Sequence, residues 1–329
     1  MTIPRDPFGE LSASAGRRRA TLLGVRCEFR GPRRLLALVD QACGGVPAQR
    51  LAGGAPECRI DLRLVRGGRA FDAAGPPPVR PGAGAGVLTG IIDADNHVVI
   101  APALRCASIV ISETLAACPY HARYELIEFA LLTLLARVRG LVPLHAACVG
   151  DGSRALLLLG DSGAGKSTLC FHAAMDGLAL LAEDSLFVEP RTLVSCALPP
   201  FVHLRQDAVR FLDGRLRRAV RASPVIRRRS GERKYEVDLR RLPGAKLSGP
   251  QRLVAAVRLE RVSTAGPRET DPRTVVAQLR REQSYASARV GWSDFIDGVS
   301  RLPCFALGRG THPRDSVVEL HELLGELSS

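Results

Sequence analysis

Lysine is scarce in this sequence, with only three residues against 43 arginines. Long apolar runs are missing too: the longest stretch, 126–135, contains Glu128 and Thr133 and falls short of the ~18 residues of a membrane span. Nine cysteines occur singly, without a C-x-x-C pair, which favours neither a disulfide framework nor a zinc site. The first residues lack the charged-then-apolar order of a signal peptide. We therefore expect a cytoplasmic protein without a membrane partner.

The net charge of +13 follows from an arginine bias that runs through the whole composition, so it does not by itself indicate nucleic-acid binding. The most basic segment, 215–241, holds ten arginines and Lys234 against three acidic residues. It is either an electrostatic guide for ATP or an acidic peptide, or a solvated insertion. Nucleic acid is the least favoured partner, because the segment contains a single aromatic residue, Tyr235, and no stacking platform.

A length of 329 residues allows about two domains. We expect a mobile arm over 1–19, an N-terminal α+β domain over 20–120 and a nucleotide-binding domain over 121–329. The Pro- and Gly-rich run 73–86 is predicted to be a linker or long loop without regular structure. Hydrophobic patterning predicts the following elements: strands at 22–29 and 58–65, a helix at 33–43, a hairpin over 90–100, a helix at 121–138, strands at 144–149 and 155–159, a helix at 166–176, strands at 178–182 and 253–260, and a terminal helix at 316–327.

A phosphate-binding loop follows the apolar strand at 155–159. The pattern G-x-x-x-x-G-K-[ST] is complete over Gly160, Asp161, Ser162, Gly163, Ala164, Gly165, Lys166, Ser167 and Thr168. Small residues let successive backbone N–H groups turn toward a triphosphate, and the following helix adds its positive end. Lys166 is predicted to reach the β- and γ-phosphates, and the Ser167 hydroxyl to complete the shell of a Mg²⁺ ion. The predicted ligands are therefore ATP and Mg²⁺.

Two features flank this loop. Glu183 and Asp184 follow the next strand, where one acid can bind Mg²⁺ and the other can accept a proton from an attacking hydroxyl. The carboxyl end of a strand is where open α/β sheets bind ligands, which favours a functional role. His145 precedes the loop beside apolar residues, and its spacing alone does not decide between a structural and a catalytic role.

The order of these features resembles the catalytic domain of HPr kinase/phosphorylase. His145 stands 15 residues before Gly160, and the acid pair follows Lys166 by 17 and 18 residues. The resemblance is strongest to divergent HPr-kinase-like proteins, in which Leu-His-Ala-Ala precedes the phosphate loop, and it covers about residues 120–190. It implies an α/β fold with a P-loop domain of the HPr kinase/PEP carboxykinase type and a smaller N-terminal α+β domain.

The resemblance also implies ATP-dependent phosphorylation of a serine hydroxyl. Carried over, Lys166 and the loop hold the phosphates, while Ser167 and Asp184 hold Mg²⁺. Glu183 or Asp184 serves as the base toward the acceptor, and His145 helps to orient the site.

Two departures modify this expectation. Glu183 stands where bacterial HPr kinases carry aspartate, so the assignment of base and metal ligand stays open between Glu183 and Asp184. The downstream glycine-rich signature is replaced by residues 199–205, Pro-Pro-Phe-Val-His-Leu-Arg. We therefore expect neither phosphorylase activity nor HPr as the acceptor. Divergent kinases of this kind modify precursor peptides, lasso peptides among them, so a peptide or protein serine is the expected acceptor.

Three alternatives remain. The segment 246–252 resembles the Leu-Ser-Gly-Gly-Gln motif of ABC-type ATPases, but the strand at 253–260 lacks the Asp-Glu pair that this machinery needs. A small-molecule kinase would use the same loop and acids with another acceptor pocket. A nucleotide-gated module would use residues 20–120 to bind a peptide without phosphoryl transfer. The sequence leaves the oligomeric state open, a homo-oligomer included.

Overall fold

The computed structural model describes residues 16–71, 75–198, 200–228, 230–261 and 266–327. The chain forms two compact units. The first comprises the described residues of Met1–Ala20, Arg26–Gly44 and Glu57–Val138, and the second those of Thr21–Val25, Gly45–Pro56 and Arg139–Ser329. Most of the arm expected over 1–19 lies outside the described residues, and the first strand begins at Gly16.

A seven-stranded sheet forms the first unit. Its spatial order is β1-β2-β3-β7-β6-β5-β4. The strands are β1 (Gly16–Leu22), β2 (Val25–Gly31), β3 (Glu57–Val65), β4 (Arg80–Gly84), β5 (Val87–Asp93), β6 (Asn96–Ala101) and β7 (Cys106–Ser112). β2, β3 and β7 pair in parallel, whereas β4, β5, β6 and β7 pair antiparallel. The predicted hairpin is thus confirmed as β5 and β6.

The loop expected over 73–86 is wrong in its second half. Arg80–Gly84 forms β4, which pairs with β5 although it contains Pro81. β4 is the edge strand and all its residues are exposed, so the N–H that proline lacks is not needed for a further strand. Residues 73 and 74 of that predicted loop lie outside the described part of the chain.

Helices of the first unit are α1 (Arg33–Cys43), η1 (Pro102–Leu104), α2 (Glu113–Ala116), α3 (Pro119–His121), η2 (Ala122–Glu128) and α4 (Phe129–Arg139). α1 has the predicted bounds and buries its apolar face, including Leu35 and Val39. The helix predicted at 121–138 is confirmed as α3, η2 and α4 in succession, with η2 a π-helical segment. η2 buries an ion pair between Arg123 and Glu128.

The second unit contains a nine-stranded sheet and a separate three-stranded sheet. The larger sheet has the order β11-β9-β10-β17-β13-β12-β8, with β19 on β17 and β18 on β19; the smaller has the order β14-β16-β15. The strands are β8 (Val142–His145), β9 (Ala147–Gly150), β10 (Arg154–Leu159), β11 (Ala179–Ala182), β12 (Ser185–Val188), β13 (Val194–Ala197), β14 (Phe201–Arg205), β15 (Val225–Arg227), β16 (Arg233–Asp238), β17 (Gln251–Leu259), β18 (Pro267–Glu269) and β19 (Cys304–Leu307).

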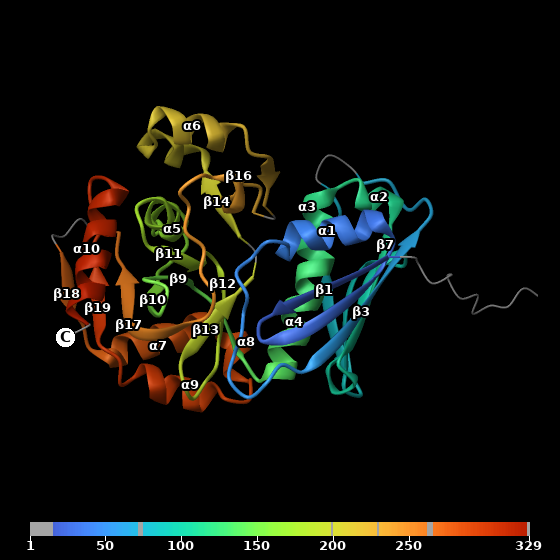
Figure 1. Ribbon diagram of the computed structural model, residues 1–329, viewed down its shortest axis with the longest axis horizontal. Helices are drawn as coiled ribbons and strands as arrows, with labels where there is room; N and C mark the ends of the chain where they lie inside the picture. The colour runs from blue at the N-terminus through green and yellow to red at the C-terminus, as the bar shows by residue number, and fades with distance from the viewer. Residues whose placement is uncertain (1–15, 72–74, 199, 229, 262–265, 328–329) are drawn as a thin grey trace, which may run out of the picture. The chain divides into compact units, whose positions relative to one another are not determined.

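Helices cover both faces of the larger sheet. The helices of the second unit are α5 (Lys166–Met175), η3 (Gln206–Phe211), α6 (Gly214–Arg221), η4 (Leu239–Arg241), α7 (Pro272–Glu282), α8 (Ser284–Ser287), α9 (Trp292–Val299) and α10 (Pro313–Glu326). α5 and α10 lie on one side of this sheet, and α7 and α9 lie on the other (Figure 1). On β10, Leu156 and Leu158 pack with α5 and α10, whereas Leu157 and Leu159 pack with α7 and α9. This alternation is the period-2 pattern of a strand between two helical layers.

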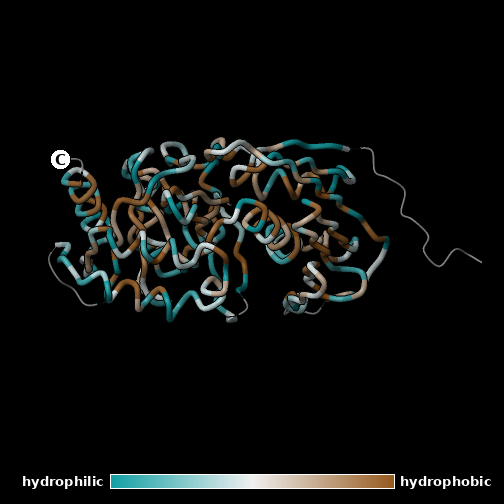
Figure 2. Tube along the Cα trace, turned by 90° about the horizontal axis from the view of Figure 1, so that it is seen from below, coloured by the Kyte–Doolittle hydropathy of each residue, from teal (hydrophilic) through white to brown (hydrophobic). Residues whose placement is uncertain are grey.

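Hydropathy follows these layers. The helix beside the C-terminal label, α10, alternates hydrophobic and hydrophilic residues (Figure 2). Val317, Leu320 and Leu324 of α10 are buried, as its amphipathic pattern predicts. No helix among the described residues has both the length and the apolar character to cross a bilayer. The predicted elements at 166–176, 178–182, 253–260 and 316–327 are confirmed as α5, β11, β17 and α10.

The single strand expected at 144–149 is wrong. The chain breaks at Ala146 into β8, which pairs with β12, and β9, which pairs with β10 and β11. Gln283 explains the break. Its side chain accepts a hydrogen bond from the N–H of His145 (2.8 Å) and donates one to the carbonyl of His145 (3.1 Å). The Gln283 amide thereby forms hydrogen bonds with the N–H and the C=O of His145, which in a continuous strand would bond to a neighbouring strand.

Candidate functional site

Four parallel strands of the second unit end at one edge of the sheet. β10 runs parallel to β17, and β17 runs parallel to β19. β9 is antiparallel to both β10 and β11, so β11 has the same direction as these three. The segments that follow the four strands therefore meet at one edge, which is where α/β sheets bind ligands.

The phosphate loop connects β10 to α5, as the sequence predicts. Gly163 (φ +81°) and Gly165 (φ +99°) adopt the left-handed conformation that glycine allows, and α5 begins at Lys166. The Lys166 ammonium donates to the carbonyl of Gly160 and lies 3.5 Å from the carbonyl of Asp161. It is thereby held over the concave side of the loop.

A pocket of about 210 Å³ opens over this loop. The predicted site residues that line it are His145, Asp161, Ser162, Gly163, Gly165, Lys166, Ser167, Thr168, Glu183 and Asp184. Gly160 and Ala164 do not line it; Gly160 offers its carbonyl to Lys166, and Ala164 is buried. The structure therefore brings together residues that lie up to 39 positions apart in the sequence.

The two acids after β11 contact different partners. Glu183 accepts a hydrogen bond from the Ser167 hydroxyl and lies 3.4 Å from Nδ1 of His203. Asp184 lies 2.6 Å from Nδ1 of His145. The two carboxylates therefore occupy different places in the pocket. Glu183 lies at the phosphate loop, and Asp184 lies at His145.

Asp184 and His145 form a pair in which the carboxylate and the protonated imidazole stabilise each other. The hydrogen bond with Asp184 raises the pKa of His145 and outweighs the lowering effect of burial. Burial raises the pKa of Asp184, but its hydrogen bond with His145 and the nearby Arg228, 3.4 Å away, bring the pKa below its ordinary value. Asp184 is therefore ionised at neutral pH.

His203 is a site residue that no pattern in the sequence indicates. It lies on β14, with its two ring nitrogens 3.4 Å from Glu183 and 3.5 Å from Glu236. Burial lowers its pKa, but the hydrogen bonds with both carboxylates prevail and raise it to about 9. His203 is thus a buried cation that ties Glu183 to β16. Only the pairing of β14 with β16 reveals this contact.

The basic segment 215–241 contributes directly to the pocket. Arg228 and Lys234 line it, together with Arg205 from β14. Glu232 lies 2.9 Å from Arg205 and 3.3 Å from Lys234, and so connects these two cations. At least part of this segment is therefore a cationic wall of the site.

Two side chains at the start of α5 that could hold a divalent cation are those of Ser167 and Glu183, whose hydroxyl and carboxylate contact each other. No cluster of three His, Cys, Asp or Glu side chains suited to a metal occurs within the described ranges. Two oxygen donors fit Mg²⁺, which is held by one or two protein oxygens together with substrate phosphates and water. The residues present therefore fit Mg²⁺ bound with a triphosphate.

Comparison with known proteins gives one kind of match. No family model and no curated protein matches the chain. Among solved structures, the chain is similar to the Hpr(Ser) kinase/phosphatase from Coxiella burnetii, with 14% sequence identity and a TM-score of 0.30. The match covers 56% of this chain and 98% of the other.

Proposed function

We propose that the second unit is an ATP- and Mg²⁺-dependent kinase that phosphorylates a serine hydroxyl of a peptide or protein, without phosphorylase activity. The observation that carries this proposal is the separation of the two acids within one pocket. Glu183 lies at the phosphate loop, and Asp184 lies beside an exposed histidine. A kinase needs one carboxylate for the metal and one for the acceptor.

The phosphate loop and Lys166 hold the β- and γ-phosphates in this proposal. Ser167 and Glu183 hold Mg²⁺, because the two side chains are in contact at the start of α5. This differs from the sequence expectation, which paired Ser167 with Asp184. The ion supplies positive charge to the phosphate oxygens as negative charge develops on them.

Asp184 is the proposed base. The acceptor oxygen forms a bond to the γ-phosphorus while the bond from that phosphorus to the β,γ-bridging oxygen breaks, and ADP leaves. The hydroxyl proton passes to the Asp184 carboxylate, which His145 orients through the 2.6 Å contact. Gln283 in turn fixes the backbone of His145 through two hydrogen bonds.

An acceptor on a polypeptide is supported by the exposure of this pair. The His145 side chain is 58% exposed, so a serine on the surface of another chain can approach Asp184. We also propose that the first unit, which has its own sheet and core, docks the acceptor. Binding energy far from the reacting hydroxyl positions the substrate in such enzymes.

Mass spectrometry of candidate acceptors tests the proposal. The protein is incubated with ATP, Mg²⁺ and peptides encoded beside its gene, and a gain of one phosphate on serine is the expected result. Lys166→Ala abolishes the gain, whereas Lys246→Ala, an exposed lysine outside the pocket, does not. Rapid ATP hydrolysis without labelled peptide favours an ATPase. ATP binding without hydrolysis or transfer favours a nucleotide-gated module, and transfer to metabolites alone favours a small-molecule kinase.

Two further variants separate the acids. Glu183→Gln raises the Mg²⁺ concentration needed for half-maximal rate, because a metal ligand is weakened. Asp184→Asn lowers kcat at saturating Mg²⁺ while ATP affinity is retained, because the proton acceptor is lost. If instead Asp184→Asn raises the Mg²⁺ requirement and Glu183→Gln lowers kcat at saturating Mg²⁺, Asp184 is the metal ligand and Glu183 is the base.

A further inference from the structure

A second recess adjoins the phosphate pocket on the side away from the acid pair. It shares four residues with that pocket: Gly165, Thr168, Phe211 and Arg309. Glu183, Asp184 and His145 do not line it. A ligand that follows the loop away from the acids therefore enters this recess.

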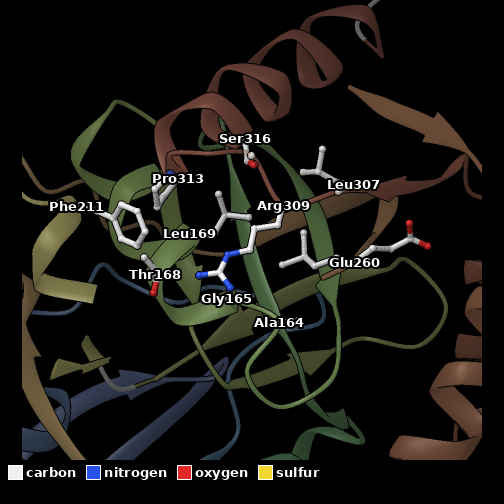
Figure 3. Close-up of a pocket in the computed structure, with 13 residues that line it drawn as sticks. Ala164, Gly165, Thr168, Leu169, Phe211, Glu260, Leu307, Arg309, Pro313 and Ser316 are labelled. Carbon is white, nitrogen blue, oxygen red and sulfur yellow. The ribbon is translucent and has the colours of Figure 1, made fainter. Parts of the chain in front are cut away.

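Apolar side chains make up most of its walls. Leu169, Leu307 and Pro313 lie around the recess, and Phe211 stands at one side of it (Figure 3). The one carboxylate of the lining, Glu260, points away from the centre in this view and pairs with Arg258 and with Arg268. The walls on this side therefore suit a largely apolar group.

The Phe211 ring is held in place before any ligand binds. The ring of His312 meets it edge-on, with 5.4 Å between centroids and 88° between planes. A ring nitrogen of His312 lies 3.2 Å from the Phe211 carbonyl, and the Arg210 guanidinium lies 4.7 Å from the ring centroid. A fixed aromatic surface favours stacking, because little side-chain entropy remains to be lost on binding.

Arg309 connects the recess to the phosphate pocket. Its guanidinium points toward the loop near Gly165 and Thr168 (Figure 3). A cation at this junction lies where the phosphate closest to a nucleoside would pass. The order of the two pockets thus matches the order of a nucleotide, with the γ-phosphate at the acids and the base at Phe211.

We propose that this recess binds the purine base of the nucleoside triphosphate by stacking on Phe211; this rests on the proposed function. A purine has a larger stacking surface than a pyrimidine, so it gains more binding free energy from contact with the Phe211 ring. The lining also includes a buried hydroxyl, that of Ser316, which can contact the base. A hydroxyl both donates and accepts, so it serves adenine and guanine alike. The site selects purines over pyrimidines and does not separate ATP from GTP.

Calorimetric titration of the full chain with ATP, GTP, UTP and tripolyphosphate, each with Mg²⁺, tests this subsite. Phe211→Leu keeps an apolar side chain but removes the aromatic face, and Phe211→Trp keeps a stacking surface. Phe211→Leu raises the Kd for ATP and GTP by about tenfold, equivalent to about 1.4 kcal/mol of stacking, and leaves the Kd for tripolyphosphate unchanged. Phe211→Trp retains tight ATP binding, and UTP binds the native protein less tightly than ATP or GTP.

The outcomes separate the two proposals. If Phe211→Leu binds ATP as tightly as the native protein does, or if UTP binds as tightly as ATP, the base lies elsewhere, and the phosphate site stands. If ATP binds much more tightly than GTP, the Ser316 hydroxyl does not serve adenine and guanine alike, and that part of the proposal is wrong. If the native protein binds neither ATP nor tripolyphosphate, the proposed kinase function itself fails. Unchanged tripolyphosphate binding in Phe211→Leu shows that the variant is folded.

Discussion

His172 of α5 makes the stability of the second unit depend on pH. Its side chain is 1% exposed, and neither ring nitrogen has a hydrogen-bond partner among the described residues. Burial lowers its pKa to about 4; Asp176 and Asp213 oppose the shift, whereas His312 and Arg314 add to it. The folded protein therefore keeps this histidine neutral at a pH at which the unfolded chain protonates it.

The sign and size of the effect follow from this difference. The unfolded chain takes up a proton near pH 6.5 and the folded chain only near pH 4, so stability falls as the pH drops through this window. Between pH 7 and pH 5 the loss is about 2 kcal/mol, and below pH 4 it reaches about 3 kcal/mol. His172→Leu removes the titrating group and therefore this part of the pH dependence.

Urea unfolding at pH 7, 6 and 5 measures the effect. The only tryptophan of the chain, Trp292, lies in α9, so its fluorescence reports on the second unit. The fall in unfolding free energy from pH 7 to pH 5 is expected to be about 2 kcal/mol smaller in His172→Leu than in the native protein. Phe171→Leu, a substitution of a buried neighbour, lowers stability by a similar amount at every pH. Equal pH slopes in the native protein and His172→Leu would refute the reasoning.

Three other outcomes are expected. Gln283→Leu removes both hydrogen bonds to the backbone of His145. It lowers stability by about 1–3 kcal/mol and slows phosphoryl transfer without weakening ATP binding. The control variant Gln278→Leu on α7 leaves transfer unchanged. Glu128→Leu removes the buried carboxylate that pairs with Arg123 and destabilises the first unit by about 3–5 kcal/mol, measured by far-UV circular dichroism in urea; a loss under 1 kcal/mol would contradict this. Chelation of Mg²⁺ by EDTA abolishes transfer and excess Mg²⁺ restores it; transfer that survives EDTA would exclude the proposed metal.

Local patterns predicted the elements around the phosphate loop well. The loop motif constrains backbone geometry over a few consecutive residues, and in the first unit α1 shows its apolar face in the sequence. Errors arose where pairing between distant strands decides the outcome. β4 contains a proline and two glycines, and it is a strand only because β5 pairs with it. Its sequence alone is that of a loop.

Three site residues could not be predicted, for the same reason: pairing between distant strands places them. His203, Phe211 and Arg309 lie on segments that join the loop only through the sheet order, from 35 to 141 residues beyond Thr168. A single sequence offers no periodicity that connects such positions. The acid pair was predictable because it follows a short strand directly after α5, whereas the partner of each acid was not.

The break at Ala146 shows how the site depends on a departure from regular structure. In a continuous strand from 144 to 149, the sheet neighbours of β9 would determine the place of His145. Instead, β8 pairs with β12 so that His145 lies opposite Ser185, the residue directly after Asp184. The antiparallel register thus places the histidine against the proposed base, and Gln283 holds the chain at the point of departure. A local loss of strand hydrogen bonds, compensated by one buried amide, brings His145 and Asp184 to 2.6 Å.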